Sequence, residues 1–180
     1  KHASQTLLVG ERFAEALHLT GLPEGLFQDL VLNPADTEKL IGSGAIDHVN
    51  FTGSVEGGRR IERAAADTFA TLGLELGGKE PAYVREDANV AYAAENLVDG
   101  SFFNSGQSCC GVERIYVHKN VYAPFVQQFI EQARGWKLGH PLDEATVVGP
   151  MARAQFADLV REQTAAALRK GATSHLKWND

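Results

Sequence analysis

The chain has 180 residues, of which 44% are hydrophobic, so it can bury the core of one ordinary domain or of two small lobes. Its 17 basic and 23 acidic side chains give a net charge of -6, and Lys and Arg form no dense cluster. Nucleic acids are bound through clustered cations, so this charge argues against a nucleic-acid partner. A membrane helix needs about 18 or more consecutive apolar residues. The sequence contains no such run, so a membrane partner is not expected either.

The cysteine content bears on the cellular compartment. Cys109 and Cys110 are the only cysteines, and they are adjacent. Adjacent cysteines are poor partners for a structural disulfide, and two are too few for a zinc site. The N-terminal residues are polar and lack a signal-peptide pattern. These features favour the cytoplasm, where thiols stay reduced.

Apolar periodicity alternates between helix and strand along the first part of the chain. Gly and Pro mark the ends of several segments. In order, the pattern predicts a helix over Thr6–Leu19, a buried strand over Leu26–Leu32, a short helix from Asn33-Pro34 through Ile41, a strand over Asp47–Thr52, a helix after Gly53-Ser54 that carries Ile61 and Phe69, and a strand over Leu72–Leu76.

After Gly77-Gly78 the pattern restarts, which predicts a boundary between two lobes there. Tyr122, Phe125 and Phe129 are expected to contribute to the core. The β-α-β order predicts an α/β fold with a parallel sheet covered by helices. The elements expected in this part are a strand over Pro81–Val84, a helix over Asn89–Phe103, a strand over Glu113–His118, and helices over Tyr122–Arg134 and Phe156–Lys170.

Small and polar residues surround Cys109, in the segment Phe103–Gly111 that follows a predicted helix. Such a loop lets the backbone approach a substrate, and nearby amides can stabilise a thiolate and then an oxyanion. The alternative is a structural cysteine, because Cys is often simply buried. From this segment alone the two interpretations are about equally supported.

Glu75 and the turn around Ser54 are weaker signals. Glu75 lies between two leucines at the end of a predicted strand; apolar surroundings make a carboxylate take up a proton more readily, which suits a general base. The alternative, an exposed Glu paired with Lys79, is the better interpretation of that segment alone.

Gly53 and Ser54 join a strand to a helix, where free amides and the helix dipole can hold a phosphate. Such turns are common in α/β folds, so this one is weak evidence for a nucleotide.

Taken together, these segments resemble the aldehyde dehydrogenase family over essentially the whole chain. The resemblance implies the aldehyde dehydrogenase fold, with residues 1–77 as part of a Rossmann-like cofactor-binding domain and residues 78–180 as part of an α/β catalytic domain. Gly149-Pro150-Met151 resembles a further Gly-Pro of the family. The motifs that occur in the family's order are Lys1-His2-Ala3-Ser4-Gln5-Thr6, Phe51-Thr52-Gly53-Ser54, Leu74-Glu75-Leu76-Gly77-Gly78-Lys79 and Phe102-Phe103-Asn104-Ser105-Gly106-Gln107-Ser108-Cys109.

The resemblance implies a role for each catalytic residue. Cys109 occupies the Cys of the family's Gly-Gln-x-Cys and would be the nucleophile, with Cys110 a small buried neighbour. Glu75 matches the general base that activates the water for thioester hydrolysis; relatives that pass the acyl group to coenzyme A tend to lack it. The amide of Cys109 would hold part of the oxyanion, and the family's second donor, an Asn from an earlier segment, does not occur in these 180 residues.

The implied cofactor is NAD or NADP. Lys1 matches the lysine that reaches the adenosine ribose, Gly53 and Ser54 match the turn beside the pyrophosphate, and Gly77 matches backbone near the nicotinamide. Ser4 stands where many NAD-preferring members have Glu. A carboxylate would repel a 2′-phosphate, whereas a hydroxyl would not, so we hypothesise that NADP is accepted or preferred.

The implied substrate is a small aldehyde that is oxidised to a carboxylic acid. Gly149-Pro150-Met151-Ala152-Arg153 and the helix that follows resemble the succinate-semialdehyde dehydrogenase branch, although these residues are expected to lie away from the aldehyde tunnel. The family resemblance also implies a homo-oligomer, a dimer or tetramer, for the full-length protein. The six histidines are scattered, so no metal is expected.

Two other functions remain open from the sequence. A cysteine hydrolase without redox chemistry would not need Lys1 or the Phe51–Ser54 turn, and it would usually need a His near Cys109. The second alternative is a non-catalytic piece of a longer enzyme, because the chain starts at Lys1 without Met and covers well under half of a usual family member. On that view the 180 residues by themselves would show little or no activity.

Overall fold

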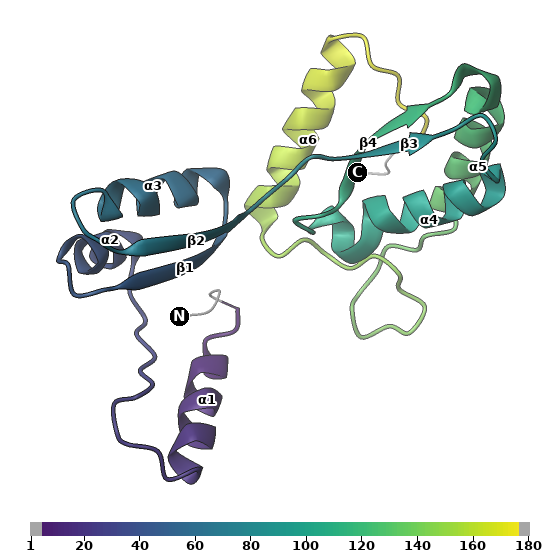
Figure 1. The fold of residues 1–180 in the computed structure, drawn as a ribbon. Helices are drawn as coiled ribbons and strands as arrows, with labels where there is room; N and C mark the ends of the chain where they lie inside the picture. The colour runs from purple at the N-terminus through teal and green to yellow at the C-terminus, as the bar shows by residue number, and fades with distance from the viewer. Residues whose placement is uncertain (1–4, 177–180) are drawn as a thin grey trace. The chain divides into compact units, whose positions relative to one another are not determined.

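The computed structural model describes residues 5–176 and divides the chain into two compact units, Lys1–Leu76 and Gly77–Asp180 (Figure 1). Both units are α/β with parallel strands, as expected. The assignment of residues 1–77 to a cofactor-binding domain and of 78–180 to a catalytic domain stays a prediction. None of the helices in the described part of the chain is both long enough and apolar enough to cross a bilayer.

The first unit is a two-stranded parallel sheet with two helices packed on one face. Its elements are α1 (Leu8–Leu19), α2 (Pro34–Gly42), β1 (His48–Gly53), α3 (Val55–Ala65) and β2 (Thr71–Leu76). Ile41 of α2 and Ile61 and Ala65 of α3 are buried against the apolar side chains of both strands. Because side chains alternate along a strand, the opposite face of this sheet carries the exposed residues His48, Asn50, Thr52, Thr71 and Glu75.

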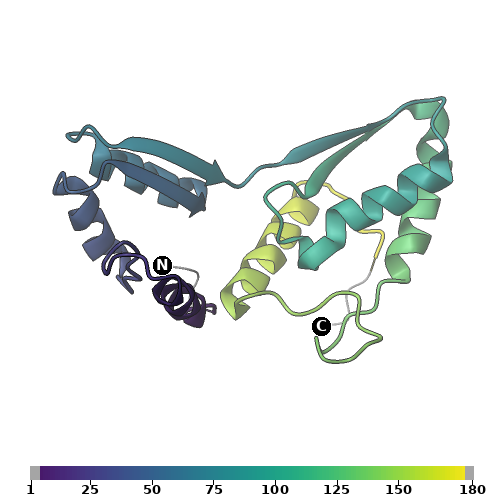
Figure 2. The ribbon, with the colours of Figure 1, turned by 60° about the horizontal axis from the view of Figure 1, so that its bottom comes forward.

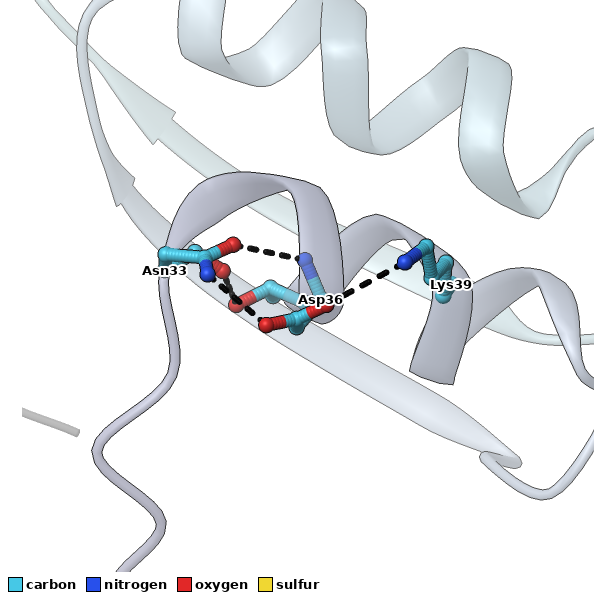
Figure 3. Close-up of polar contacts among 4 residues, drawn as sticks. Asn33, Asp36 and Lys39 are labelled. Carbon is cyan, nitrogen blue, oxygen red and sulfur yellow. Dashed lines mark hydrogen bonds and ion pairs between the residues drawn. The ribbon is translucent and has the colours of Figure 1, made fainter.

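Helix α2 begins where the Asn33-Pro34 pair predicts. Asn33 is the N-cap: its Oδ1 accepts from the backbone N–H of Asp36 at 2.9 Å, and its Nδ2 donates to Asp36 Oδ2 at 2.7 Å (Figure 3). Pro34 fits the first helical position because that residue needs no intrahelical N–H bond. Lys39 Nζ lies 3.4 Å from Asp36 Oδ1, one turn along. Local capping is therefore enough to start this helix.

Two expectations for this unit are wrong. Leu26–Leu32 is not a strand: no strand of the described residues pairs with it, and Leu26 and Val31 are exposed. A run of apolar residues without a pairing partner has no ladder to hold it extended. Phe69 lies outside α3 and is fully exposed. The helix ends before it because the hydroxyl and N–H of Thr68 both donate to the carbonyl of Ala65.

The second unit packs two helices against another parallel strand pair. Its elements are β3 (Glu80–Val84), α4 (Val90–Phe102), β4 (Val112–Val117), α5 (Tyr122–Arg134) and α6 (Ala154–Arg169), with short 3-10 turns at η1 (Phe103–Gly106) and η2 (Lys119–Val121). Figure 2 shows α4 and α5 side by side below β3 and β4. Val84, Ala94 and Phe125 form the buried core between these elements.

The boundaries of α4 and α5 agree with the sequence pattern. Asn89 caps α4 by accepting from the N–H of Tyr92 at 3.1 Å, and Phe125 and Phe129 face the core as expected. Tyr122 does not, because it is the first residue of α5 and is 54% exposed. At the other end of α4, the ring centroid of Phe102 lies 6.2 Å from the ring centroids of both Phe129 and Trp136. This aromatic contact holds the end of α4, after which the Cys109 segment begins.

Candidate active site

Two expected site segments meet at one edge of the β1–β2 sheet. The strands run parallel, with Thr52 opposite Glu75 and Gly53 opposite Leu76. Their carboxyl ends therefore lie together, and Ser54 follows directly after β1. Open parallel sheets bind ligands outside the carboxyl ends of their strands. The first unit thus brings Gly53, Ser54 and Glu75 to the edge where such a ligand would bind.

The turn after β1 is shaped by Ser54 and by an aromatic ring. Ser54 is the N-cap of α3, and its Oγ accepts from the N–H of Gly57 at 3.1 Å. The ring of Phe51 packs so closely that a Cβ at Gly53 would lie 2.6 Å from Phe51 Cζ, and one at Gly57 would lie 2.7 Å from it. Larger residues at either glycine would displace the ring.

This turn offers donors to an anion. A Ser hydroxyl has one hydrogen and two lone pairs, so the capping bond leaves the O–H of Ser54 free to donate. Helical geometry also leaves the first backbone N–H groups, those of Val55 and Glu56, without an intrahelical acceptor. Oxygens of a phosphate group match these donors, and the helix dipole adds to the attraction.

Glu75 is exposed in its unit, on the face of β2 away from the core. The apolar surroundings expected from Leu74 and Leu76 are therefore not present there, because the leucines point to the other face. Lys79, the partner of Glu75 in the alternative interpretation, forms an ion pair with Glu113. Glu75 lies in the first unit and Cys109 in the second, so each is described within its own unit.

Cys109 lies in a tight turn with its side chain exposed. Residues 108–111 form a turn in which the N–H of Gly111 donates to the carbonyl of Ser108 at 3.2 Å. Cys109 and Cys110 are its central residues, and both are exposed. The expectation that Cys110 is buried is therefore wrong, because the middle of such a turn projects outward. The Sγ of Cys110 lies 3.3 Å from Ser108 Oγ.

The backbone before Cys109 has an unusual conformation. Asn104 and Ser105 have φ values of 52° and 59°, and Gly106 follows with 72°. The left-handed region is uncommon for residues that carry a Cβ, and it concentrates at functional sites. Here the left-handed residues follow the end of α4 and redirect the chain toward the turn that contains Cys109.

Hydrogen bonds tie this loop to a distant segment, a link that the sequence analysis missed. Ser105 Oγ donates to the carbonyl of Gly149 at 2.7 Å. Gln107 Oε1 accepts from the N–H of Ala152 at 2.9 Å. The Gly149–Ala152 segment therefore contacts the loop that carries Cys109; the expectation that it lies away from the aldehyde tunnel stays a prediction. The Gly-Gln-x-Cys motif contained Gln107, but nothing in its local pattern indicated the partner.

Gly78 leaves little room for a side chain beside Cys109. A Cβ at Gly78 would overlap the Glu80 carboxylate, which is a flexible side chain, and would lie 3.0 Å from the carbonyl oxygen of Cys109, which is backbone and cannot easily move. A hydrogen bond fixes the chain next to Gly78, because Arg114 Nε donates to the carbonyl of Lys79 at 3.0 Å. Gly78, the second glycine after Glu75, thus lies close to the turn of the candidate nucleophile.

Of the three remaining predicted cofactor residues, the structure describes Gly77. Lys1 and Ser4 lie outside the described residues. Gly77 is exposed, and the position of its missing Cβ has no atom within 4 Å among the described residues. A flat group could therefore approach the backbone of Gly77 closely. Between residues 5 and 176, no three His, Cys, Asp or Glu side chains are grouped closely enough to hold a metal ion.

Comparison with known proteins gives the family. The model of the aldehyde dehydrogenase family matches residues 1–177, so this chain belongs to the aldehyde dehydrogenase family. Among curated relatives, it is 34% identical over 173 residues to succinate-semialdehyde dehydrogenase [NADP(+)] of Mycobacterium avium, covering 96% of this chain and 37% of that protein. It is 35% identical over 178 residues to betaine aldehyde dehydrogenase of Brucella ovis, covering 96% of this chain and 36% of the relative.

Solved structures agree with the fold. The structure of 3,6-anhydro-L-galactose dehydrogenase in complex with NAP matches with a TM-score of 0.92 and 33% identity, over 99% of this chain and 38% of the other. Lactaldehyde dehydrogenase from Escherichia coli matches with a TM-score of 0.85 and 36% identity, over 92% of this chain and 35% of the other. The expected aldehyde dehydrogenase fold is thereby confirmed. The chain spans a little over a third of the length of the relatives.

Proposed function

We propose that the polypeptide carrying these 180 residues oxidises an aldehyde to a carboxylic acid, with NAD or NADP as oxidant and Cys109 as nucleophile. The observation that carries the proposal is the exposed Cys109 thiol. It is held in a turn that follows the left-handed loop, the hydrogen-bonded segment Asn104–Gly106 whose residues have positive φ values. The Ser54 turn adds support, because a hydrolase would not need a turn that offers donors to a phosphate.

Each residue has a defined task in this reaction. The Cys109 thiolate adds to the aldehyde carbon and forms a thiohemiacetal, whose oxyanion the Cys109 amide helps to hold. A bound nicotinamide cofactor would supply the hydride acceptor for this carbon, and loss of the hydride would convert the thiohemiacetal on Cys109 to a thioester. Glu75 takes a proton from water, which attacks the thioester carbon. The C–S bond breaks, the carboxylic acid leaves, and the proton held by Glu75 passes to the Cys109 sulfur, which restores the thiol.

The cofactor residues of this proposal are Lys1, Ser4, Gly53, Ser54 and Gly77. Support comes from the Ser54 turn, whose free hydroxyl hydrogen and helix-start amides suit a pyrophosphate, and from the open backbone of Gly77. For the ribose, Ser4 lacks the carboxylate that would repel a 2′-phosphate, so we propose that NADP is used at least as well as NAD. The ratio of kcat/KM for the two cofactors tests this, and a large preference for NAD would refute it.

We further propose succinate semialdehyde as the aldehyde. The similarity to the Mycobacterium avium enzyme supports this substrate, whereas relatives named for betaine aldehyde and lactaldehyde are similarly close. A panel of the three aldehydes at equal concentration tests the proposal; a higher kcat/KM for either competitor would overturn it. The proposed setting is the cytoplasm and the proposed assembly a dimer or tetramer, which light scattering of the full-length protein tests.

The decisive experiment follows NAD(P)H absorbance in the full-length protein. Cys109→Ala is expected to abolish hydride transfer, while Cys110→Ala, a matched control one residue away, keeps it. Glu75→Gln is expected to keep a pre-steady-state burst of NAD(P)H and to slow the turnover that follows, because thioester formation survives and its hydrolysis does not. An active Cys109→Ala variant would disprove the nucleophile assignment.

A further inference from the structure

We propose that Gln107 is a positioning residue for Cys109. Its side chain fixes the position of Cys109 by joining the left-handed loop to the Gly149–Ala152 segment through hydrogen bonds. This inference rests on the proposed function, in which Cys109 is the nucleophile. Gln107 is partly buried and precedes Cys109 by two residues, so a change in its placement is transmitted directly to the turn that carries the thiol.

The left-handed loop needs these hydrogen bonds because its backbone lies in a disfavoured region of φ/ψ space. Asn104 and Ser105 both have left-handed φ and ψ values, although each carries a Cβ. Asn is among the residues that tolerate this region, whereas Ser visits it less often. Contacts with the surroundings must therefore hold the conformation in place.

Gln107 meets Asn104 through three hydrogen bonds. The backbone N–H and the Nε2 of Gln107 both donate to the carbonyl of Asn104, each at 3.1 Å. In return, Asn104 Nδ2 donates to the carbonyl of Gln107 at 3.1 Å. The two residues thus close a small ring of hydrogen bonds around the left-handed stretch.

The same Gln107 side chain reaches a second partner outside the loop. Its Oε1 accepts from the N–H of Ala152 at 2.9 Å, and the neighbouring Ser105 hydroxyl donates to the carbonyl of Gly149 at 2.7 Å. The partner segment is itself held, because Val148 pairs with Leu138 in an isolated β-bridge. Both loop anchors therefore end on one fixed piece of chain.

The arrangement explains why this position needs an amide side chain. One end must donate to a carbonyl and the other must accept from an N–H, and among side chains of this length only Gln does both. Glu keeps the acceptor for Ala152 but cannot donate to Asn104 when ionised. Met has similar length and does neither. The three side chains thus form a graded series.

The test measures alkylation of Cys109 by iodoacetamide across pH, together with the NAD(P)H burst, in the full-length protein. Because a displacement of about 1 Å can cost a hundredfold in rate, Gln107→Met is expected to slow the burst by roughly tenfold to a hundredfold. Its alkylation profile should also shift along the pH axis. Gln107→Glu is expected to fall between Met and the wild type, and the KM for the cofactor should stay unchanged in both.

The control is Gln127→Met, the same substitution on the exposed side of α5, where Gln127 donates only to Glu131. Equal burst rates in Gln107→Met and this control would overturn the positioning role. So would a Gln107→Glu variant that loses activity in proportion to a loss of folded protein in thermal melts. An active Cys109→Ala variant would instead reject the proposed function, so the two failures are distinguishable.

Discussion

The hydroxyl group of Ser54 should have two roles that substitutions can separate. As an acceptor it caps α3 through the N–H of Gly57, and as a donor it is available to a pyrophosphate oxygen. Ser54→Ala removes both. Losing an N-cap costs about 1 kcal/mol of folding free energy. Losing one hydrogen bond to a charged group costs about 1.5–3 kcal/mol, which corresponds to roughly a tenfold to 150-fold rise in the cofactor Kd.

Ser54→Asp separates the two roles. Asp is as good an N-cap as Ser, so the free energy of unfolding should stay near the wild-type value. Its carboxylate would repel the pyrophosphate, so cofactor affinity should be lost. Asn89→Ala is the matched control, because Asn89 caps α4 at the same 3.1 Å distance but lies in the second unit. It should lower stability by about 1 kcal/mol and leave the cofactor Kd unchanged.

Two measurements on the full-length protein decide the matter. Urea unfolding gives the free energies, and calorimetric titration with NAD and with NADP gives the Kd values. Wild-type affinity of Ser54→Ala or Ser54→Asp for both cofactors would contradict the donor role of the Ser54 hydroxyl. So would an Asn89→Ala variant that binds the cofactors as weakly as Ser54→Ala does, since the loss of affinity would then follow stability alone.

Two further substitutions test the second unit. Gly78→Ala would displace the Glu80 carboxylate and place a Cβ 3.0 Å from the Cys109 carbonyl, so it should slow the NAD(P)H burst by roughly a hundredfold; a burst at the wild-type rate would contradict the close approach. Phe125→Ala removes a buried ring from the core and should cost about 3–5 kcal/mol in urea unfolding, whereas Tyr122→Ala, exposed on the same helix, should cost less than about 1 kcal/mol. Equal losses would show that α5 faces the core differently.

Much of the fold could be predicted because its signals are local. The Asn33-Pro34 pair and Asn89 mark helix starts by capping, and α5 begins and ends at the residues that apolar periodicity indicates. The order of strands and helices was also enough to predict parallel pairing in both units. The helix starts depend on residues a few positions apart, whereas the parallel pairing follows from the order of the elements along the chain.

The wrong predictions have different causes: a missing strand partner for Leu26–Leu32, and local turns for Phe69 and Cys110. Leu26–Leu32 has the composition of a strand but no pairing strand among the described residues, and composition does not reveal a partner. Phe69 continued the apolar pattern of α3, yet Thr68 caps the last turn before it. Cys110 is a residue type that is often buried, and the turn it occupies projects it outward.

By itself the sequence determined the family and the identity of the candidate groups, because Cys109, Glu75 and Ser54 lie in motifs whose residues are contiguous. Their roles stay predictions. Only the tertiary structure decided what surrounds the nucleophile: the loop anchors on Gly149 and Ala152 join residues 44 and 45 positions apart. Hydrogen bonds over such separations arise from the packing of whole elements, so no local pattern of residues encodes them.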